Sequence, residues 1–565
     1  MGLTRASRTT VAAAILLLGA ALVVAPSAAA NPGATIRILF DLGDGTYVWA
    51  TETIPDPAAV NATWLAVQHA AASHHIPMSS RWYNGYGVFI SDLGGSIPAT
   101  FQWDPLGNRW AGLRVSFSNF TASEGDAFAL YAAGFSSSPP YVAREPVPTP
   151  EHPQPSMTFR GNLYNTGVSP SPVPDRIRVA WDADTGIREI ESTPAVAGGS
   201  LFASTMRGLL ALNASTGAIL WNNSNGKGLS SPAVFNDSVF VGTSRGSVIR
   251  VDAETGEGIW ETRLLPSTTF TGISSSPKIA GDRVFIGTFN ESGGPGEVVA
   301  LAEGDGHVLW RHGTGSVHFS TPAVADGTVY VGIMGTYNTT SQVSFEPPYG
   351  VVALDAATGG QKWFRTTGGS VAASPAVAGP NVIVPAKDGV VYSLNRTTGE
   401  VVWTSAVDAG ISSPAVSGDA VFVGCGAFGA PGKVVALDTA TGAQRWSVPT
   451  NGPVQASLTY AGGKVLFATN TAHGTISALD ATTGSLAWSY EPLPSEYILG
   501  SPVVADGVVY APSDNGHVVA LAENLQGPAS SSLGTLLAVG GTVVAVVAVA
   551  VLAWVMIRRR RRVGP

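Results

Sequence analysis

The chain has 565 residues, of which 45% are hydrophobic and only 12% are charged, and its formal net charge is −8. Seven of the 31 basic residues lie in the first 30 residues and the last eight, which hold none of the 39 acidic residues, so the remainder is strongly acidic. We therefore expect no nucleic-acid partner, because phosphate binding needs a basic surface.

The two ends of the chain predict export and membrane anchoring. Residues 1–30 have the pattern of a signal peptide, with Arg5 and Arg8 before an apolar run and small residues at Ala28–Ala30 for cleavage. Residues 533–557 carry no charge and, at about 1.5 Å per residue, exceed a hydrocarbon core of roughly 30 Å. Arginines 558–562 follow at once and mark the cytoplasmic side. We expect a single-pass cell-membrane protein with most of the chain extracytoplasmic, a linker at 526–532, one C-terminal transmembrane helix at 533–557 and a basic cytoplasmic tail at 558–565.

Residues 31–135 predict a small α+β domain. The expected strands are Thr35–Asp41, Tyr47–Thr53, Tyr86–Ile90, Phe101–Asp104 and Phe128–Tyr131. The first two form a hairpin around Gly43–Gly45. A helix is predicted over Asn61–Ala72, with Asn61 as its cap. Its expected apolar face consists of Trp64, Leu65, Val67 and Ala71. Two strands, a helix and then further strands form a β-grasp-like order.

This domain resembles the transcobalamin C-terminal-like β-grasp family, also called DUF4430. The matching stretches are the helix, the strand Tyr86–Leu93, the hairpin Phe101–Trp110 and the segment Glu124–Leu130. In the vitamin carriers of this family the domain forms one half of a cobalamin site, and an α/α barrel forms the other half. That barrel is absent here, so the resemblance implies a ligand- or protein-binding role without cobalamin.

Aromatic residues are dense in this small domain and supply the candidate ligand contacts. The candidates are Trp82, Tyr83, Tyr86, Trp103 and Trp110. Clustered Trp and Tyr outside a core are typical of carbohydrate or protein contact. The alternative is that they form the core and rim of the domain.

A Pro-rich linker at 136–156 separates this domain from a repeat region at 157–525. Each repeat opens with Ser-Pro-Ala-Val or a close variant and ends with a Trp. The Trp comes four residues after a turn glycine in seven copies, as in Gly256 and Trp260. The repeat tryptophans are Trp181, Trp221, Trp260, Trp310, Trp363, Trp403, Trp446 and Trp488. Even spacing of short strands and Gly-rich turns predicts a closed all-β array of stacked units.

The repeat count predicts a mainly β protein with an eight-bladed β-propeller after the α+β domain. The openings are at Pro194, Pro232, Pro277, Pro322, Pro375, Pro414, Leu458 and Pro502. The last unit lacks its Trp strand, and Arg176–Trp181 precedes the first opening, so we expect this strand to complete the last blade. In each turn an Asp side chain accepts backbone N–H groups and the Gly supplies a positive φ. The Trp ring packs between neighbouring sheets.

The repeat, with its lead-in Phe159–Asn162 and Asn165–Gly167, resembles the PQQ-like (quinoprotein-type) β-propeller family. The resemblance implies one of two functions. Some members are alcohol and sugar dehydrogenases that hold pyrroloquinoline quinone and Ca²⁺ at the propeller axis. Others are not enzymes, including scaffold lipoproteins of outer-membrane assembly.

The sequence favours a protein that is not an enzyme. Many of the dehydrogenases carry adjacent cysteines over the quinone, whereas this chain has one cysteine, Cys425, which is expected to be an inert core thiol. Glu291, Asp305 and Glu346 are candidate Ca²⁺ ligands but match no family site. We find no catalytic residue and predict no cofactor and no metal. We expect a cell-surface binding or scaffold protein with a protein or glycan partner; the alternatives are a quinone- and Ca²⁺-dependent dehydrogenase and an envelope-protein assembly scaffold.

Overall fold

The computed structural model describes residues 34–131 and 159–524. Short gaps remain at 43–46, 56–58, 84–86, 94–97, 105–108, 113–115, 123–125, 189, 236, 266–271, 281, 290–294 and 342–343. The predicted signal peptide, Pro-rich linker, C-terminal span and basic tail lie outside the described residues. Within the described ranges, no helix is long and apolar enough to cross a membrane.

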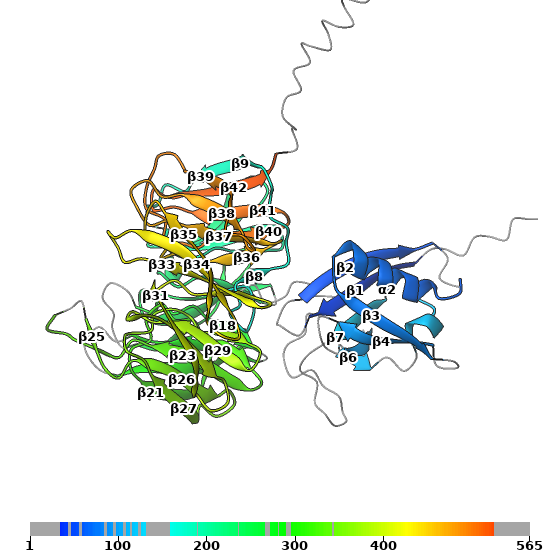
Figure 1. The fold of residues 1–565 in the computed structure, drawn as a ribbon, viewed down its shortest axis with the longest axis horizontal. Helices are drawn as coiled ribbons and strands as arrows, with labels where there is room; N and C mark the ends of the chain where they lie inside the picture. Colours follow the sequence, from blue (N-terminus) through cyan, green and yellow to red (C-terminus); the bar gives the residue numbers. More distant parts are fainter. Residues whose placement is uncertain are drawn as a thin grey trace, which may run out of the picture.

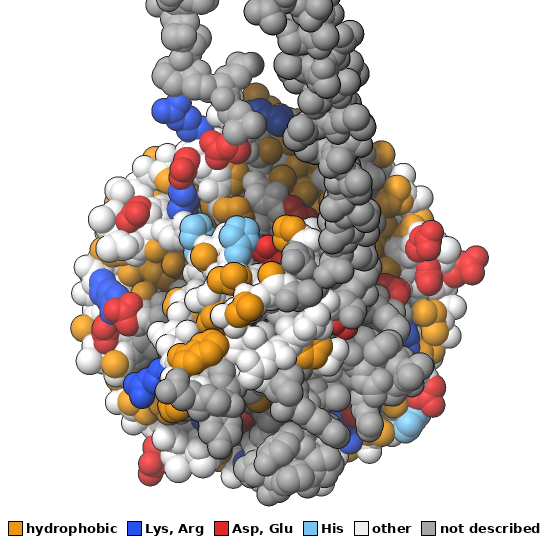
Figure 2. Space-filling model, turned by 90° about the vertical axis from the view of Figure 1, so that its right-hand side faces the viewer, with side chains coloured by type: hydrophobic (Ala, Val, Ile, Leu, Met, Phe, Trp, Pro, Cys, Tyr) orange, Lys and Arg blue, Asp and Glu red, His pale blue; other side chains and the backbone are white. Residues whose placement is uncertain are grey.

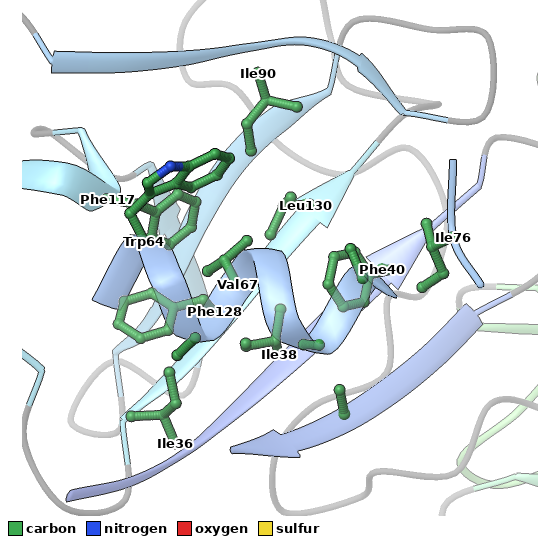
Figure 3. Close-up of a cluster of buried hydrophobic side chains, with 14 of the residues drawn as sticks. Ile36, Ile38, Phe40, Trp64, Val67, Ile76, Ile90, Phe117, Phe128 and Leu130 are labelled. Atoms are coloured by element: carbon green, nitrogen blue, oxygen red, sulfur yellow. The ribbon is translucent and has the colours of Figure 1, made fainter. Parts of the chain in front are cut away.

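The N-terminal domain is a five-stranded sheet covered by one helix. Its strands are β1 Ala34–Asp41, β2 Tyr47–Ile54, β5 Ala99–Asp104, β6 Arg109–Gly112 and β7 Ala127–Tyr131. They lie in the order β2-β1-β7-β5-β6, with β1 and β7 parallel. The helix α2, Ala62–Ser73, and the short η1, Phe117–Asn119, contribute side chains to the core between helix and sheet (Figure 3). The predicted hairpin, helix and later strands are therefore present.

The helix turns a slightly different face inward from the one predicted. Its buried residues are Thr63, Trp64, Ala66, Val67, Ala70 and Ala71. The prediction of Leu65 as a core residue is wrong, because Leu65 is 58% exposed and lies beside the buried i, i+3, i+4 stripe. Asn61 does precede the helix, but its backbone is left-handed (φ 60°) and its side chain makes no capping hydrogen bond.

A separate two-stranded sheet pairs β3, Met78–Tyr83, with β4, Gly87–Leu93. Strand β4 was expected, but β3 was not. Five of the six β3 side chains are exposed on both faces of the ribbon, so the strand carries no hydrophobic alternation that a sequence pattern could detect.

The repeat region folds into eight four-stranded units in a propeller-like arrangement. The first three contain β10 Ala195–Ala197, β11 Ser200–Thr205, β12 Gly208–Asn213, β13 Ile219–Asn223; β14 Ala233–Phe235, β15 Ser238–Gly242, β16 Ser247–Asp252, β17 Gly258–Arg263; and β18 Lys278–Ala280, β19 Arg283–Gly287, β20 Gly296–Ala302, β21 Val308–Thr314. The fourth and fifth contain β22 Ala323–Ala325, β23 Thr328–Ile333, β26 Gly350–Asp355, β27 Gln361–Thr366; and β28 Ala376–Ala378, β29 Asn381–Pro385, β30 Gly389–Asn395, β31 Val401–Ala409. The sixth and seventh contain β32 Ala415–Ser417, β33 Ala420–Cys425, β34 Gly432–Asp438, β35 Gln444–Thr450; and β36 Thr459–Ala461, β37 Lys464–Ala468, β38 Ile476–Asp480, β39 Leu486–Tyr490.

The eighth unit is completed by the first strand of the region. It contains β40 Val503–Ala505, β41 Val508–Pro512, β42 His517–Glu523 and β9 Ile177–Asp184. As predicted, strand β9 pairs with β42 of the last unit (Figure 1); the pairing is antiparallel and sets Trp181 opposite Ala520. Additional short elements are β8 Val168–Ser169, parallel to β36, the hairpin β24 Thr336–Tyr337 with β25 Phe345–Glu346, and η2 Ser224–Gly226.

The repeat tryptophans join neighbouring units, as predicted. Each indole N–H donates to a backbone carbonyl at 2.9–3.1 Å; the acceptors are, in chain order, Ala214, Ala253, Glu303, Ala356, Arg396, Thr439, Ala481 and Pro174. The turn glycines have φ near +73° and press against the tryptophan ring of the preceding unit, so a Cβ there would overlap the ring. Asp or Asn side chains accept the N–H groups two and three residues ahead, as Asp252 does from Glu254 and Thr255.

The Ser and Thr residues that begin the units are also linked to one another by hydrogen bonds. We call this series of hydrogen bonds the hydroxyl girdle. The backbone N–H of one opening residue donates to the hydroxyl oxygen of the next at 2.9–3.1 Å. The bonds join Thr193 to Ser231, Ser231 to Ser276, Thr321 to Ser374, Ser374 to Ser413, Ser413 to Ser457, Ser457 to Ser501, and Ser501 back to Thr193. The bond from Ser501 to Thr193 thus joins the last unit to the first.

Candidate functional site

Residues 159–171, which we call the lead-in segment, run along the first strands of successive units. Four N–H groups on these strands donate to its carbonyls at 2.7–2.8 Å: Val324 to Leu163, Val377 to Tyr164, Val416 to Thr166 and Tyr460 to Gly167. Further along, the Ser169 hydroxyl donates to Val504 at 2.8 Å. The segment therefore occupies the inner edges of the fourth to eighth units.

Polar side chains fix this segment in the interior. Asn165 is fully buried and its amide donates to the carbonyls of Thr321 at 3.0 Å and Pro375 at 3.2 Å. The buried Lys278 ammonium donates to the carbonyls of Phe159 at 2.9 Å and Asn162 at 2.8 Å. Burial, and then the positive charge of Arg160, lowers the pKa of Lys278 well below its usual value.

Sequence reasoning missed the lysine of this interior cluster, although a signal was present. Lys278 stands in Ser-Pro-Lys-Ile, where most other units have Ser-Pro-Ala-Val or Thr-Pro-Ala-Val, so a charged residue occupies a position that is buried in most copies. A lysine that breaks the pattern at such a position indicates a specific acceptor set, because an ammonium is costly to bury without one.

The described residues do not fit pyrroloquinoline quinone with Ca²⁺ at this part of the interior. All eight repeat tryptophans lie on the outermost strands, where their rings contact neighbouring sheets, and the lead-in segment occupies the inner edges of the fourth to eighth units. Of the candidate Ca²⁺ ligands, Asp305 bonds to His307 in an exposed turn and Glu346 accepts from Asn338. Glu291 lies outside the described residues. In the described part, no three His, Cys, Asp or Glu side chains gather as metal ligands.

His318 lies in an aromatic cluster at the loop before β22. Its Nδ1 is 2.6 Å from the Ser274 hydroxyl, and its ring is 4.8 Å from that of Phe289. Burial, and then the positive charge of Lys387, lowers the pKa of His318 to about 3. The imidazole is therefore neutral at physiological pH. Cys425 is buried as expected, and burial raises the pKa of its thiol to about 12.

Two of the five aromatic candidates lie together on the exposed strand β3. Trp82 is 56% exposed and Tyr83 is 48% exposed, and the Tyr83 ring makes an edge contact with Phe89 of β4 at 6.2 Å. The other edge of β4 is held by side chains: the Ser116 hydroxyl donates to the Val88 carbonyl, and the Val88 N–H donates to Ser118. In the described ranges β3 pairs only with β4, so its outer edge is open.

The remaining aromatic candidates are separate from that edge. Trp110 is partly buried, and its ring packs 6.1 Å from that of Trp49 on the five-stranded sheet. Trp103 lies opposite Trp110 in the register of β5 and β6. Tyr86 lies outside the described residues. Trp82 and Tyr83 are thus neighbours on opposite faces of β3, whereas Trp110 packs against Trp49 on the five-stranded sheet.

The surface on the side of the N-terminal domain carries mixed charges. Figure 2 shows basic side chains in blue dispersed among acidic ones in red, with hydrophobic side chains in orange between them and no continuous basic area on the described part of this face.

Comparison with known proteins identifies the repeat region. A family model described as outer membrane protein assembly factor BamB matches residues 178–333, 294–457 and 387–527. BamB of Burkholderia pseudomallei is 28% identical over 314 residues, covering 50% of this chain and 73% of that protein. The quinone alcohol dehydrogenase subunit of Komagataeibacter europaeus is 31% identical over 188 residues, which are 28% of this chain and only 25% of that protein.

Solved structures agree on the fold. The quinohemoprotein alcohol dehydrogenase ADHIIG of Pseudomonas putida HK5 superposes with a TM-score of 0.55 at 16% identity, covering 66% of this chain and 81% of that one. The corresponding enzyme of Comamonas testosteroni gives the same TM-score and identity. At this identity the likeness concerns the fold alone. The family model, in contrast, spans most of the chain, and the chain belongs to the PQQ-like repeat family described as outer membrane protein assembly factor BamB.

Proposed function

We propose that this protein is a membrane-anchored, extracytoplasmic scaffold that binds a protein partner through its N-terminal β-grasp-like domain. The predicted signal peptide and C-terminal span supply export and anchoring. The repeat region acts as a rigid, non-catalytic platform in the form of a closed eight-bladed propeller. The hydrogen bonds from Ser501 to Thr193 and from Trp488 to Pro174 support this closure.

The open edge of β3 carries the proposal. Natural proteins protect the edges of their sheets, because an exposed strand offers unpaired N–H and C=O groups to other chains. Here the exposed strand also carries Trp82 and Tyr83, residue types enriched where partners bind. An extended segment of a partner can add to such an edge as a further strand. The backbone groups favour a polypeptide over a glycan, and the family's name supports a protein partner.

Site-specific photocrosslinking in the host cell envelope tests the partner. A photoreactive amino acid replaces Tyr83 in the full-length protein, and a second variant carries it at Leu486, which is 62% exposed on β39. We expect a discrete protein adduct from position 83 that is absent from position 486 and lost when Trp82→Ala is added. Equal adducts from both positions, or adducts to saccharide alone, would contradict a protein partner at β3.

The cofactor prediction has its own test. A ligand at 100 times its Kd stabilises a protein by about 2.7 kcal/mol. We expect the midpoint of thermal unfolding to stay unchanged when pyrroloquinoline quinone and Ca²⁺ are added to the purified full-length protein. An increase in the midpoint, with quinone absorbance retained after gel filtration, would instead place the protein with the dehydrogenases.

A further inference from the structure

A cavity of about 430 Å³ opens beside the lead-in segment, between the first strands of the eighth and first units. One wall is formed by β40 and another by β10, and the lead-in segment contributes Arg160 and residues 167–171, with Pro172 next to them. Val48, Trp49 and His74 of the N-terminal domain also line it. A volume of this size lies within the range of small-molecule sites, about 300–1,000 Å³.

The cavity lies where the lead-in segment leaves an inner edge uncovered. In the fourth unit, Val324 lies opposite Val329 and sends its N–H to the carbonyl of Leu163. Val196 holds the same position on β10, opposite Leu201, and lines the cavity. Across the described ranges no carbonyl accepts the Val196 N–H in the way that Leu163 accepts that of Val324. The Val196 N–H therefore lacks the lead-in partner that the Val324 N–H has.

Arg160 provides a buried positive charge in the cavity wall. The residue is only 4% exposed, and its Nη2 donates to the Pro414 carbonyl at 2.8 Å. Its Nε is buried without a hydrogen-bond partner. Burial lowers the pKa of Arg160 to about 9. Among the described lining residues the one carboxylate belongs to Asp506, which is exposed at a turn.

We infer that this cavity binds a small organic carboxylate, with Arg160 as its cationic partner. A buried charge is stabilised by an opposite charge and by hydrogen bonds, and a planar guanidinium matches a carboxylate. Hydroxyl groups of Thr193 and Ser501 at the cavity wall supply further donors. The apolar side chains of Ala195, Val196 and Val503 suit the hydrocarbon part of an organic acid better than the oxygens of a phosphate.

Isothermal titration calorimetry of the purified full-length protein tests the site. The probes are succinate and benzoate, with succinamide and benzamide as uncharged counterparts of the same shape, all at constant ionic strength. We expect saturable binding of at least one carboxylate and at least tenfold weaker binding of its amide. Inorganic phosphate is titrated in parallel, and an affinity equal to that of the carboxylates would overturn the assignment.

Two kinds of variant locate the binding. Arg160→Met keeps an unbranched apolar stem but removes the guanidinium and its charge, and should weaken binding at least tenfold, whereas Arg160→Lys should retain part of it. Ala505→Leu fills the cavity from the last position of β40 without altering Arg160. Its matched control is Ala378→Leu, at the last position of β28, outside the cavity.

If Arg160→Met fails to fold, the variants Ala505→Leu and Ala378→Leu test the site without it. We expect Ala505→Leu to abolish saturable binding and Ala378→Leu to leave the dissociation constant unchanged. The inference is wrong if neither carboxylate binds the wild-type protein, or if Ala505→Leu binds as tightly as Ala378→Leu.

Discussion

At the scale of single residues, each turn glycine of the repeat meets two separate constraints. Its backbone has a positive φ, which residues with a Cβ rarely adopt, and its α-carbon lies against a tryptophan ring of the preceding unit. Either constraint alone favours glycine. Together they explain why glycine recurs at this turn position along the repeat region.

Two glycines separate these constraints. Gly442 has φ +71° and a Cβ added there would lie 2.5 Å from the Trp403 ring, whereas Gly463 has φ +76° and open space around it. We expect Gly463→Ala to destabilise the protein by about 1 kcal/mol, through φ alone. Gly442→Ala should cost about 2–4 kcal/mol, because overlap with the ring is added. Guanidinium unfolding followed by far-UV circular dichroism measures both. Equal losses would show that the ring contact is irrelevant.

His318 makes stability depend on pH. Its folded pKa of about 3 lies below the unfolded value of about 6.5, so the unfolded chain takes up the proton first as pH falls. Stability should therefore fall below pH 6.5, by about 1–2 kcal/mol at pH 5. Unfolding free energies at pH 7 and pH 5 should differ less in His318→Gln than in the wild type. The control His473→Gln, at a largely exposed histidine, should keep the wild-type difference.

At the scale of elements, the sequence predicted the repeating strands and most strands of the N-terminal domain, and it missed β3 and the short strands β8, β24 and β25. The eight openings and the pairing of β9 with β42 follow from periodic residues such as Pro194 and Trp181. Strand β3 was not predicted, because both its faces are exposed and its sequence therefore has no hydrophobic alternation. The hydrogen bonds of Arg160 and Asn165 were not predicted, because their acceptors lie more than 150 positions away in the sequence. No local sequence pattern encodes contacts over such a separation.

The joint between the first and last units can be tested within the hydroxyl girdle. The Thr193 hydroxyl accepts the Ser501 N–H at 3.0 Å, whereas the buried Thr321 hydroxyl has no hydrogen-bond partner. Thr193→Val should leave that N–H unsatisfied and cost about 1–3 kcal/mol. Thr321→Val replaces an unpaired hydroxyl by a methyl group in a side chain of the same shape. It should leave the stability unchanged or raise it slightly. The unfolding midpoints of the two variants are compared. Equal midpoints would contradict a contribution of the Ser501–Thr193 hydrogen bond to stability.

At the scale of the whole molecule, the repeat units are linked by more than contacts between sequence neighbours. In open repeat arrays each unit contacts only its neighbours, so terminal units can unfold separately. Here the last unit contains β9, and the lead-in segment bonds to several first strands at once. Loss of one unit therefore removes contacts from many others.

We expect the repeat region to unfold in one cooperative step. Tryptophan fluorescence reports the junctions between units, and far-UV circular dichroism reports the strands themselves. The two denaturation curves should coincide in the wild type. They should separate in Trp181→Ala, which loosens β9 from the first unit. Separate curves in the wild type would indicate that the units unfold independently.

Strand β9 also has a consequence for biosynthesis. It is made before all the other strands of the eight units, yet its partner β42 is the last of them, with Ile177 opposite Glu523. Closing a loop of that length is slow compared with forming local hairpins. A chain interrupted before β42 leaves the first-made strand without its partner, so incomplete products expose an edge that proteases can recognise while finished ones do not.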